Sequence, residues 1–235
     1  IQHYLINNFK KMKLNINFTN KVPKMAKDNE IILLNQKAIK IKEIKQLTNT
    51  VFSNKLFSEK NFLLKDYNDK SYIFVNCTNS KASLDFEKLG SKLYVFLKEN
   101  KKENSFINLP NNSLTNVQLQ KFLHGAQLKS YNFNLYKTYK KKNEPNINLS
   151  VVGSGIKQKN LVRNKLNALL EGVFLTRDLV SEPGNILHPD EYAKRLKSLK
   201  TNGLKINIYN AKKLKKLGMN ALLGVGQGSV RGSYL

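Results

Sequence analysis

Short segments of the chain alternate apolar and polar positions or form compact apolar runs, which are the two patterns of β-strands. The alternation is clearest from Met12 to Phe18, which reads Met-Lys-Leu-Asn-Ile-Asn-Phe. Residues 31–34 and 72–75 are apolar runs, residues 106–109 and 147–152 are mostly apolar, and each segment is bounded by polar or turn-forming residues. We therefore expect five strands in the first 152 residues.

Between these strands the apolar residues recur every three or four positions, as on one face of a helix. Ser83 is placed to cap a helix with acidic residues in its first turn. Thr115 is placed to cap a second helix. The apolar faces of the two helices are Phe86, Leu89, Leu93 and Phe96, and Leu119, Phe122, Leu123 and Ala126.

The last third of the chain predicts three helices and two strands. A long helix runs from about Lys157 to Val180 and ends before Pro183 and Gly184. A second helix begins at Pro189 and a short third one covers residues 212–217. The remaining segments, residues 204–209 and 221–225, predict strands from their alternation and their apolar content.

Strands that alternate with helices predict an α/β fold, with a mixed sheet flanked by helices. The turn Gly153-Ser154-Gly155 is the best candidate for a domain boundary. We expect an N-terminal α/β domain over residues 12–156. Residues 157–235 would form a connecting helix and the incomplete start of a second α/β domain. Residues 1–11 precede the first regular pattern and are interpreted as an upstream extension or tail, so nothing is built on His3.

The chain carries 41 Lys and Arg against 16 Asp and Glu, a formal net charge of +25. Such a charge favours polyanionic partners, because basic side chains release the counterions of phosphates. Only four of the basic residues are Arg, however, which is the residue that reads bases and grips phosphates bidentately. The charge is also spread along the whole chain. Nucleic-acid binding therefore stays an alternative rather than the main expectation.

The sequence also indicates the compartment. No stretch reaches the roughly 18 to 20 consecutive apolar residues that a membrane-spanning helix needs, so we expect no membrane association. The single cysteine, Cys77, cannot form an internal disulfide. We expect a cytoplasmic protein in which Cys77 is a small core residue rather than a nucleophile.

Two glycine-rich segments resemble phosphate-binding loops. Gly224-Val225-Gly226-Gln227-Gly228-Ser229 follows a predicted strand but lacks the lysine and the hydroxyl pair of a P-loop. Gly153-Ser154-Gly155 has Gln158 where a dinucleotide fingerprint needs its third glycine. Both are better explained as turns that need unusual backbone angles.

The histidines offer no complete catalytic or metal site either. His188 precedes Pro189, Asp190 and Glu191, which is the ordinary chemistry of a helix start, and no second ligand follows one turn later. His124 has no acidic neighbour within a turn and is expected to be hydrogen-bonded or solvated. We assign no catalytic, cofactor-binding or metal-binding residue.

Three ordered segments carry a family resemblance. The residues Thr176 to Pro189, Thr-Arg-Asp-Leu-Val-Ser-Glu-Pro-Gly-Asn-Ile-Leu-His-Pro, resemble the entry to the catalytic domain of the leucyl (cytosol) aminopeptidase family. Gly184 departs from the Pro or Ala common in that turn. The segment from Gly125 to Thr138 is similar to the end of the family's N-terminal domain. Residues 217–229 are similar to the segment that precedes the family's metal site.

The resemblance implies a metalloaminopeptidase that removes N-terminal residues from peptides with two divalent ions, usually zinc or manganese, in a homohexamer. The family's ligands and catalytic residues follow the segment that ends at Ser229, and the chain given stops at Leu235. We therefore expect no cofactor and no activity in this chain, and unpaired strand edges after residue 183. The alternative is a basic, non-enzymatic nucleic-acid-binding module.

Overall fold

The computed structural model describes residues 13–26, 28–34, 61–109, 114–138, 146–153 and 160–235. The chain divides into two compact units, and the division falls between Gly172 and Val173 in the sequence. The predicted boundary at Gly153 to Gly155 lies partly outside the described residues. The predicted tail at residues 1–11 and Gln158 lie wholly outside them. The predicted domain limits therefore stay predictions.

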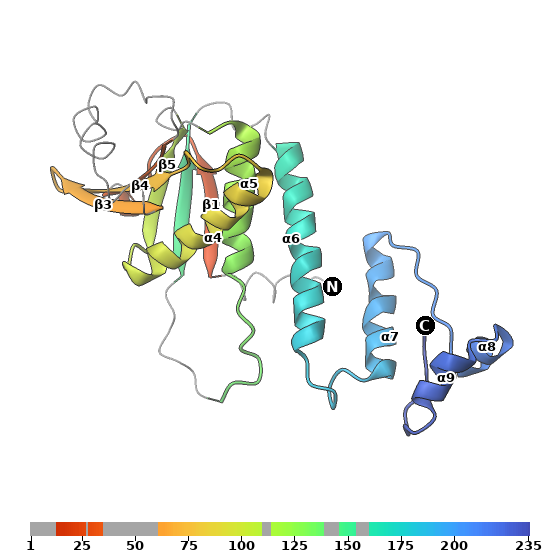
Figure 1. The fold of residues 1–235 in the computed structure, drawn as a ribbon. Coiled ribbons are helices and arrows are strands. Elements are labelled where there is room, and N and C mark those ends of the chain that lie inside the picture. Colours follow the sequence, from red (N-terminus) through yellow and green to blue (C-terminus); the bar gives the residue numbers. More distant parts are fainter. Residues whose placement is uncertain (1–12, 27, 35–60, 110–113, 139–145, 154–159) are drawn as a thin grey trace. The chain divides into compact units, whose positions relative to one another are not determined.

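The first unit contains a mixed sheet with the strand order β1-β6-β5-β2-β4-β3 (Figure 1). Its strands are β1 (Leu14–Thr19), β2 (Asn29–Leu34), β3 (Phe62–Tyr67), β4 (Lys70–Asn76), β5 (Asn104–Asn108) and β6 (Ile147–Val152). All neighbouring pairs are parallel except β3 with β4. A short 3-10 helix, η1 (Lys24–Ala26), lies between β1 and β2. The predicted mixed α/β sheet is confirmed.

Strand β3 was not predicted. It pairs antiparallel with β4 through a two-residue turn in which Asn68 and Asp69 have φ values of 47° and 59°. Asn and Asp tolerate this left-handed backbone, which matches the twist of a tight hairpin. Residues 66–70 thus form the tip of a hairpin whose first strand begins at Phe62.

Two helices cover one face of the sheet, α4 (Ser83–Glu99) and α5 (Asn116–Lys129). They share one hydrophobic core with the sheet, because α/β layers bury the apolar stripe of each helix against the strands. From the helices the core includes Phe86, Leu89, Leu93, Leu119, Phe122, Leu123 and Ala126, and from the strands Ile31, Leu33, Ile73, Val75, Ile107, Leu149 and Val151.

The caps of these helices differ in how well they match expectation. Thr115 caps α5 as predicted: its Oγ1 accepts from the Gln118 N–H at 3.4 Å, and Gln118 Oε1 accepts from the Thr115 N–H at 2.9 Å. The prediction for α4 is wrong by one residue, because Ser83 is already helical and Ala82 is the N-cap. Asp85 Oδ2 accepts from the N–H groups of Lys81 and Ala82 instead, at 3.0 and 2.8 Å. These backbone hydrogen bonds lower the pKa of Asp85.

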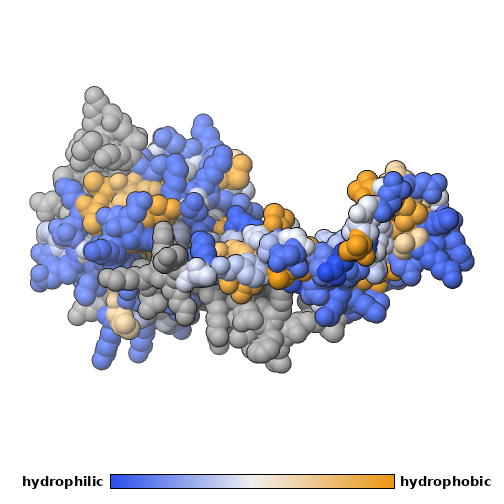
Figure 2. Space-filling view, turned by 90° about the horizontal axis from the view of Figure 1, so that it is seen from below, coloured by the Kyte–Doolittle hydropathy of each residue, from blue (hydrophilic) through white to orange (hydrophobic). Residues whose placement is uncertain are grey.

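The second unit consists of the last residues of α6 (Asn160–Ser181), α7 (Pro189–Ser198), the 3-10 helix η4 (Leu199–Asn202), α8 (Ala211–Lys216) and α9 (Asn220–Gly226). Among its described residues the buried apolar side chains are Phe174, Ala193 and Leu214. Val225 and Val230 are instead 87% and 103% exposed. Figure 2 accordingly shows apolar side chains on the visible surface of this unit.

Both strands predicted here are wrong. Residues 221–225 lie in α9, because a short apolar run does not distinguish a strand from a helix. Within residues 204–209 the structure gives a ladder hydrogen bond only at Tyr209, which exchanges backbone hydrogen bonds with Leu235 at 2.7 and 3.0 Å. The expected unpaired strand edges are therefore not formed by these segments.

Candidate functional site

Residues 176–189, which carry part of the family resemblance, form the end of α6, a turn and the start of α7. Helix α6 ends at Ser181, and the carbonyl of Pro183 then accepts from the N–H groups of Ile186 and Leu187, both at 2.9 Å. His188 caps α7, and Pro189 occupies its first turn, where the missing N–H costs nothing. The predicted helix start at Pro189 is confirmed.

Arg195 joins the two sides of this junction. Its Nε donates to Glu191 Oε1 at 3.1 Å, one turn earlier in α7, and its Nη1 donates to Glu182 Oε1 at 3.2 Å, at the end of α6. The Glu182 side chain is only 7% exposed, so its pair with Arg195 is partly shielded from water. The hydrogen bond from Arg195 lowers the pKa of Glu191. The i, i+4 spacing of Glu191 and Arg195 was a usable sequence signal, whereas the contact with Glu182 was not.

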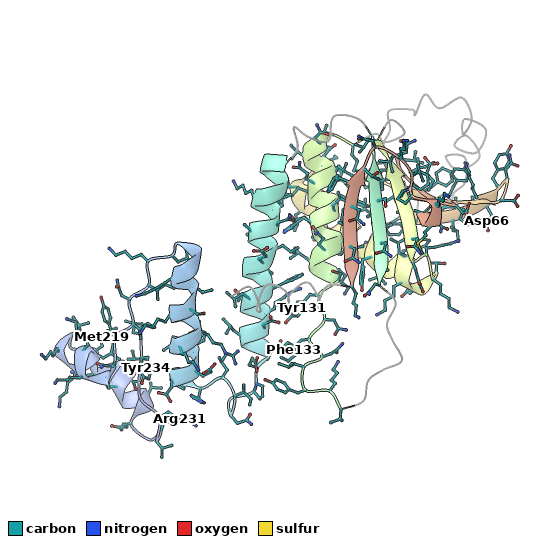
Figure 3. The ribbon with its side chains drawn as sticks, turned by 180° about the vertical axis from the view of Figure 1, so that it is seen from behind. Asp66, Tyr131, Phe133, Met219, Arg231 and Tyr234 are labelled. Atoms are coloured by element: carbon teal, nitrogen blue, oxygen red, sulfur yellow. The ribbon has the colours of Figure 1, made fainter. Side chains whose placement is uncertain are left out.

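Asp190 is the meeting point of a second set of side chains, the Asp190 cluster, formed by His188, Asp190, Arg231 and Tyr234. Asp190 Oδ2 lies 3.3 Å from His188 Nδ1 and 3.5 Å from Arg231 Nη1. Tyr234 hydrogen-bonds to Asp190, and this bond together with the negative charge raises the pKa of the Tyr234 phenol. Figure 3 shows Arg231 and Tyr234 on the same C-terminal segment. The cluster holds that segment against the start of α7.

His188 has a structural role in this arrangement. Its Nδ1 accepts from the Glu191 N–H at 3.4 Å, as an N-cap side chain does. Among the residues that the structure describes, no group of three or more His, Cys, Asp and Glu side chains is arranged to hold a metal ion. The interpretation of His188 as part of a helix start agrees with its place as the N-cap of α7.

The expectation that the glycine-rich segment near the C-terminus is a turn with unusual backbone angles is wrong, because its first half is helical. Gly224 and Gly226 belong to α9, and Gln227 is its C-cap. The Ser229 N–H donates to the Gly226 carbonyl at 3.1 Å, and Ser229 Oγ accepts from the Arg231 N–H at the same distance. A helix C-terminus presents carbonyl oxygens and a partial negative charge, which disfavours an anion.

The other glycine candidate, Gly153, serves packing. Its φ of +154° is rarely adopted by other residues, and a Cβ there would lie 2.9 Å from the Leu109 Cβ. Its N–H donates to the Thr19 carbonyl at 3.1 Å, which extends the pairing of β1 with β6. The rest of this loop, with Ser154 and Gly155, lies outside the described residues.

Cys77 and His124 are both buried in the first unit. Cys77 is 3% exposed, and burial raises the pKa of its thiol to about 12, so the prediction of an unreactive core residue agrees with its environment. The expectation for His124 is wrong. The residue is 3% exposed, and neither ring nitrogen has a partner within hydrogen-bond distance among the described residues; Glu87 Oε1 lies 3.6 Å from Nδ1.

The comparisons with known proteins agree with the resemblance seen in the sequence. Residues 174–235 match the model of the cytosol aminopeptidase family, catalytic domain. A probable cytosol aminopeptidase of Phytoplasma australiense is 42% identical over 118 residues, which are 50% of this chain and 24% of that protein. One of Nitrobacter winogradskyi is 34% identical over 163 residues, 68% of this chain and 33% of that protein.

Solved structures show the same fold. A mutant of tomato leucine aminopeptidase matches with a TM-score of 0.69 at 20% identity, over 94% of this chain and 49% of that one. The bottromycin maturation enzyme BotP in complex with Mn matches with a TM-score of 0.61 at 17% identity, over 89% and 44%. The chain thus spans about half the length of these structures, and its alignments cover a quarter to a third of the curated relatives. No helix in the described part of the chain is long and apolar enough to cross a membrane.

Proposed function

We propose that this chain, which belongs to the cytosol aminopeptidase family, is the N-terminal portion of a metal-dependent enzyme that releases N-terminal amino acids from peptides. The observation that carries the proposal is the match of residues 174–235 to the family's catalytic domain. The same residues form the α6–α7 junction, held by Arg195, and the segment tied to Asp190. Residues 12–156, which include the six-stranded sheet, would serve as the N-terminal domain.

The family resemblance implies two divalent ions, manganese or zinc, which polarise a scissile carbonyl and supply a hydroxide nucleophile when bound. The described residues do not fit such a centre. Three of the carboxylates near the junction, Glu182, Asp190 and Glu191, are each bonded to an arginine, and no group of three metal-ligating side chains is found among the described residues. No step of the reaction is therefore assigned to a residue of this chain.

We accordingly propose that residues 1–235 alone do not hydrolyse peptides, and that the metal ligands and catalytic residues belong to a longer gene product. A homohexamer, a cytoplasmic location and a role in peptide catabolism are part of the same proposal. Their support is the family resemblance.

The test is to sequence the gene past the codon for Leu235 and to express both this chain and any longer product. Hydrolysis of leucine p-nitroanilide is then measured with Mn²⁺ or Zn²⁺ at neutral pH. We expect metal-dependent hydrolysis by the longer product and none by residues 1–235. Hydrolysis by the shorter chain would show that its own residues suffice, and a stop codon directly after Leu235 would remove the proposed enzyme.

A second candidate function is nucleic-acid binding without catalysis. The observation that favours it is the charge of residues 192–235, which contain ten Lys and Arg and no Asp or Glu. The four lysines of α8 are all exposed. Binding of a fluorescent DNA duplex should then weaken steeply between about 50 and 200 mM salt, because each phosphate that a basic side chain neutralises releases counterions. Binding that is absent at 50 mM salt would exclude this function.

A further inference from the structure

His124 is buried inside the contact between α4 and α5, and the proposed function does not explain why a histidine lies there. Both ring nitrogens are buried, and neither has a hydrogen-bond partner among the residues that the structure describes. A polar group left without a hydrogen bond in a protein interior destabilises the fold. A leucine in the same place would avoid that cost, so the position is unusual for a side chain that only packs.

The contact around His124 is tight because two glycines allow the helix backbones to touch. A Cβ on Gly90 of α4 would lie 2.7 Å from the carbonyl carbon of Phe122 in α5. A Cβ on Gly125, next to His124, would lie 2.6 Å from the Cα of Glu87. The two helix backbones therefore approach closely beside His124, whose ring nitrogens are both buried from solvent.

Two charged groups face the ring, one from each helix. Glu87 Oε1 of α4 lies 3.6 Å from His124 Nδ1 and 2.8 Å from Lys121 Nζ of α5. Glu87 is therefore already paired with Lys121 when the imidazole is neutral. A proton on His124 would place a second cation beside Lys121, with one carboxylate shared between them.

We propose that His124 makes the contact between α4 and α5 sensitive to pH, so that the helices pack tightly around a neutral imidazole and loosen when the ring is protonated. The energetic balance supports this direction. Burial lowers the pKa of His124 from its usual value of 6.5, and Glu87 opposes the effect only in part. Lys121 adds to the lowering.

The sign of the stability effect follows from proton linkage. Because the folded state has the lower pKa, the unfolded state binds more protons as the pH falls below about 6.5. The contribution of the neutral imidazole to stability is fully present above pH 6.5. It is lost as the pH falls, until the pH reaches the pKa of His124 in the folded state. The opening equilibrium constant should rise by up to about tenfold for each pH unit in this range.

The experiment measures amide hydrogen exchange in α4 and α5 of the whole chain between pH 5.0 and 7.5, corrected for intrinsic exchange rates. We compare the unchanged chain with His124→Gln and with His188→Asn, a control that removes a histidine from another helix and keeps a capping side chain. Protection of α4 and α5 should fall on acidification in the unchanged chain and in His188→Asn. In His124→Gln this pH-dependent part should disappear.

A second measurement keeps the proposal testable if His124→Gln does not fold. Deuterium exchange at the imidazole C2 position, followed by mass spectrometry, gives the pKa of His124 in the unchanged protein. A value clearly below 6.5 supports the proposal. A value of 6.5 or above, or equal pH dependence of α4 and α5 in the chain with His124→Gln, overturns it.

Discussion

Replacing Gly90 with alanine should destabilise the first unit, although alanine is the better helix former. The added Cβ would lie 2.7 Å from the Phe122 carbonyl carbon, at least 0.7 Å short of the 3.4 Å of ordinary contact. The obstacle is backbone, so α4 and α5 must separate, and with them the core that they share with the sheet. Overpacking of this kind costs about 1 to 3 kcal/mol.

The gain in helix propensity from Gly to Ala offsets up to about 1 kcal/mol of that cost. Because a helix must move rather than a side chain, we expect the upper part of the range and a net loss of about 2 kcal/mol. For a chain of this size such a loss lowers Tm by roughly 4 to 8 °C. Urea unfolding followed by far-UV circular dichroism measures it, and hydrogen exchange in α4 and α5 locates it.

The matched control is Gly172→Ala in α6, where an added Cβ meets nothing within 4 Å. There the propensity gain acts alone, so stability should stay equal or rise by up to about 1 kcal/mol. If Gly90→Ala proves as stable as Gly172→Ala, the close approach of α4 and α5 is not what the glycine permits, and the reasoning fails.

Two further predictions concern the cap of α5 and the buried thiol. Thr115→Ala should cost about 1 kcal/mol of unfolding free energy and Thr115→Ser much less, because serine keeps the oxygen that accepts from the Gln118 N–H; equal losses in urea unfolding would contradict the cap. Cys77, with its pKa raised to about 12, should react with Ellman's reagent at pH 8 only as the protein unfolds in urea, and reaction at the rate of a free thiol in the native protein would show that it is accessible.

The sequence predicted those elements whose local signals agree with their surroundings. The predicted strands at residues 147–152 and 72–75 became β6 and the centre of β4, because alternate apolar residues of each strand face the shared core. Thr115 began α5 because a threonine with a glutamine three residues later satisfies two backbone donors locally.

Other features could not be predicted from the local sequence, because they depend on residues that are distant in the chain. Residues 204–209 alternate like a strand, but a strand also needs a neighbour, and in the described structure only Tyr209 has one. The environment of His124 depends on Glu87 of α4, which lies 37 residues earlier in the sequence. Its exposure and charge partner could not be inferred from the spacing within α5.

The pairing of β1 with β6 sets the order in which the sheet can be completed during synthesis. Leu14 pairs with Ile147 and Thr19 with Val152, so β1 has no partner in the sheet until β6 has emerged from the ribosome. At about 5 to 20 residues per second, 133 residues take roughly 7 to 27 s. During this interval β2 and β4 can already pair, while β1 remains an unpaired segment of the nascent chain that is accessible to chaperones.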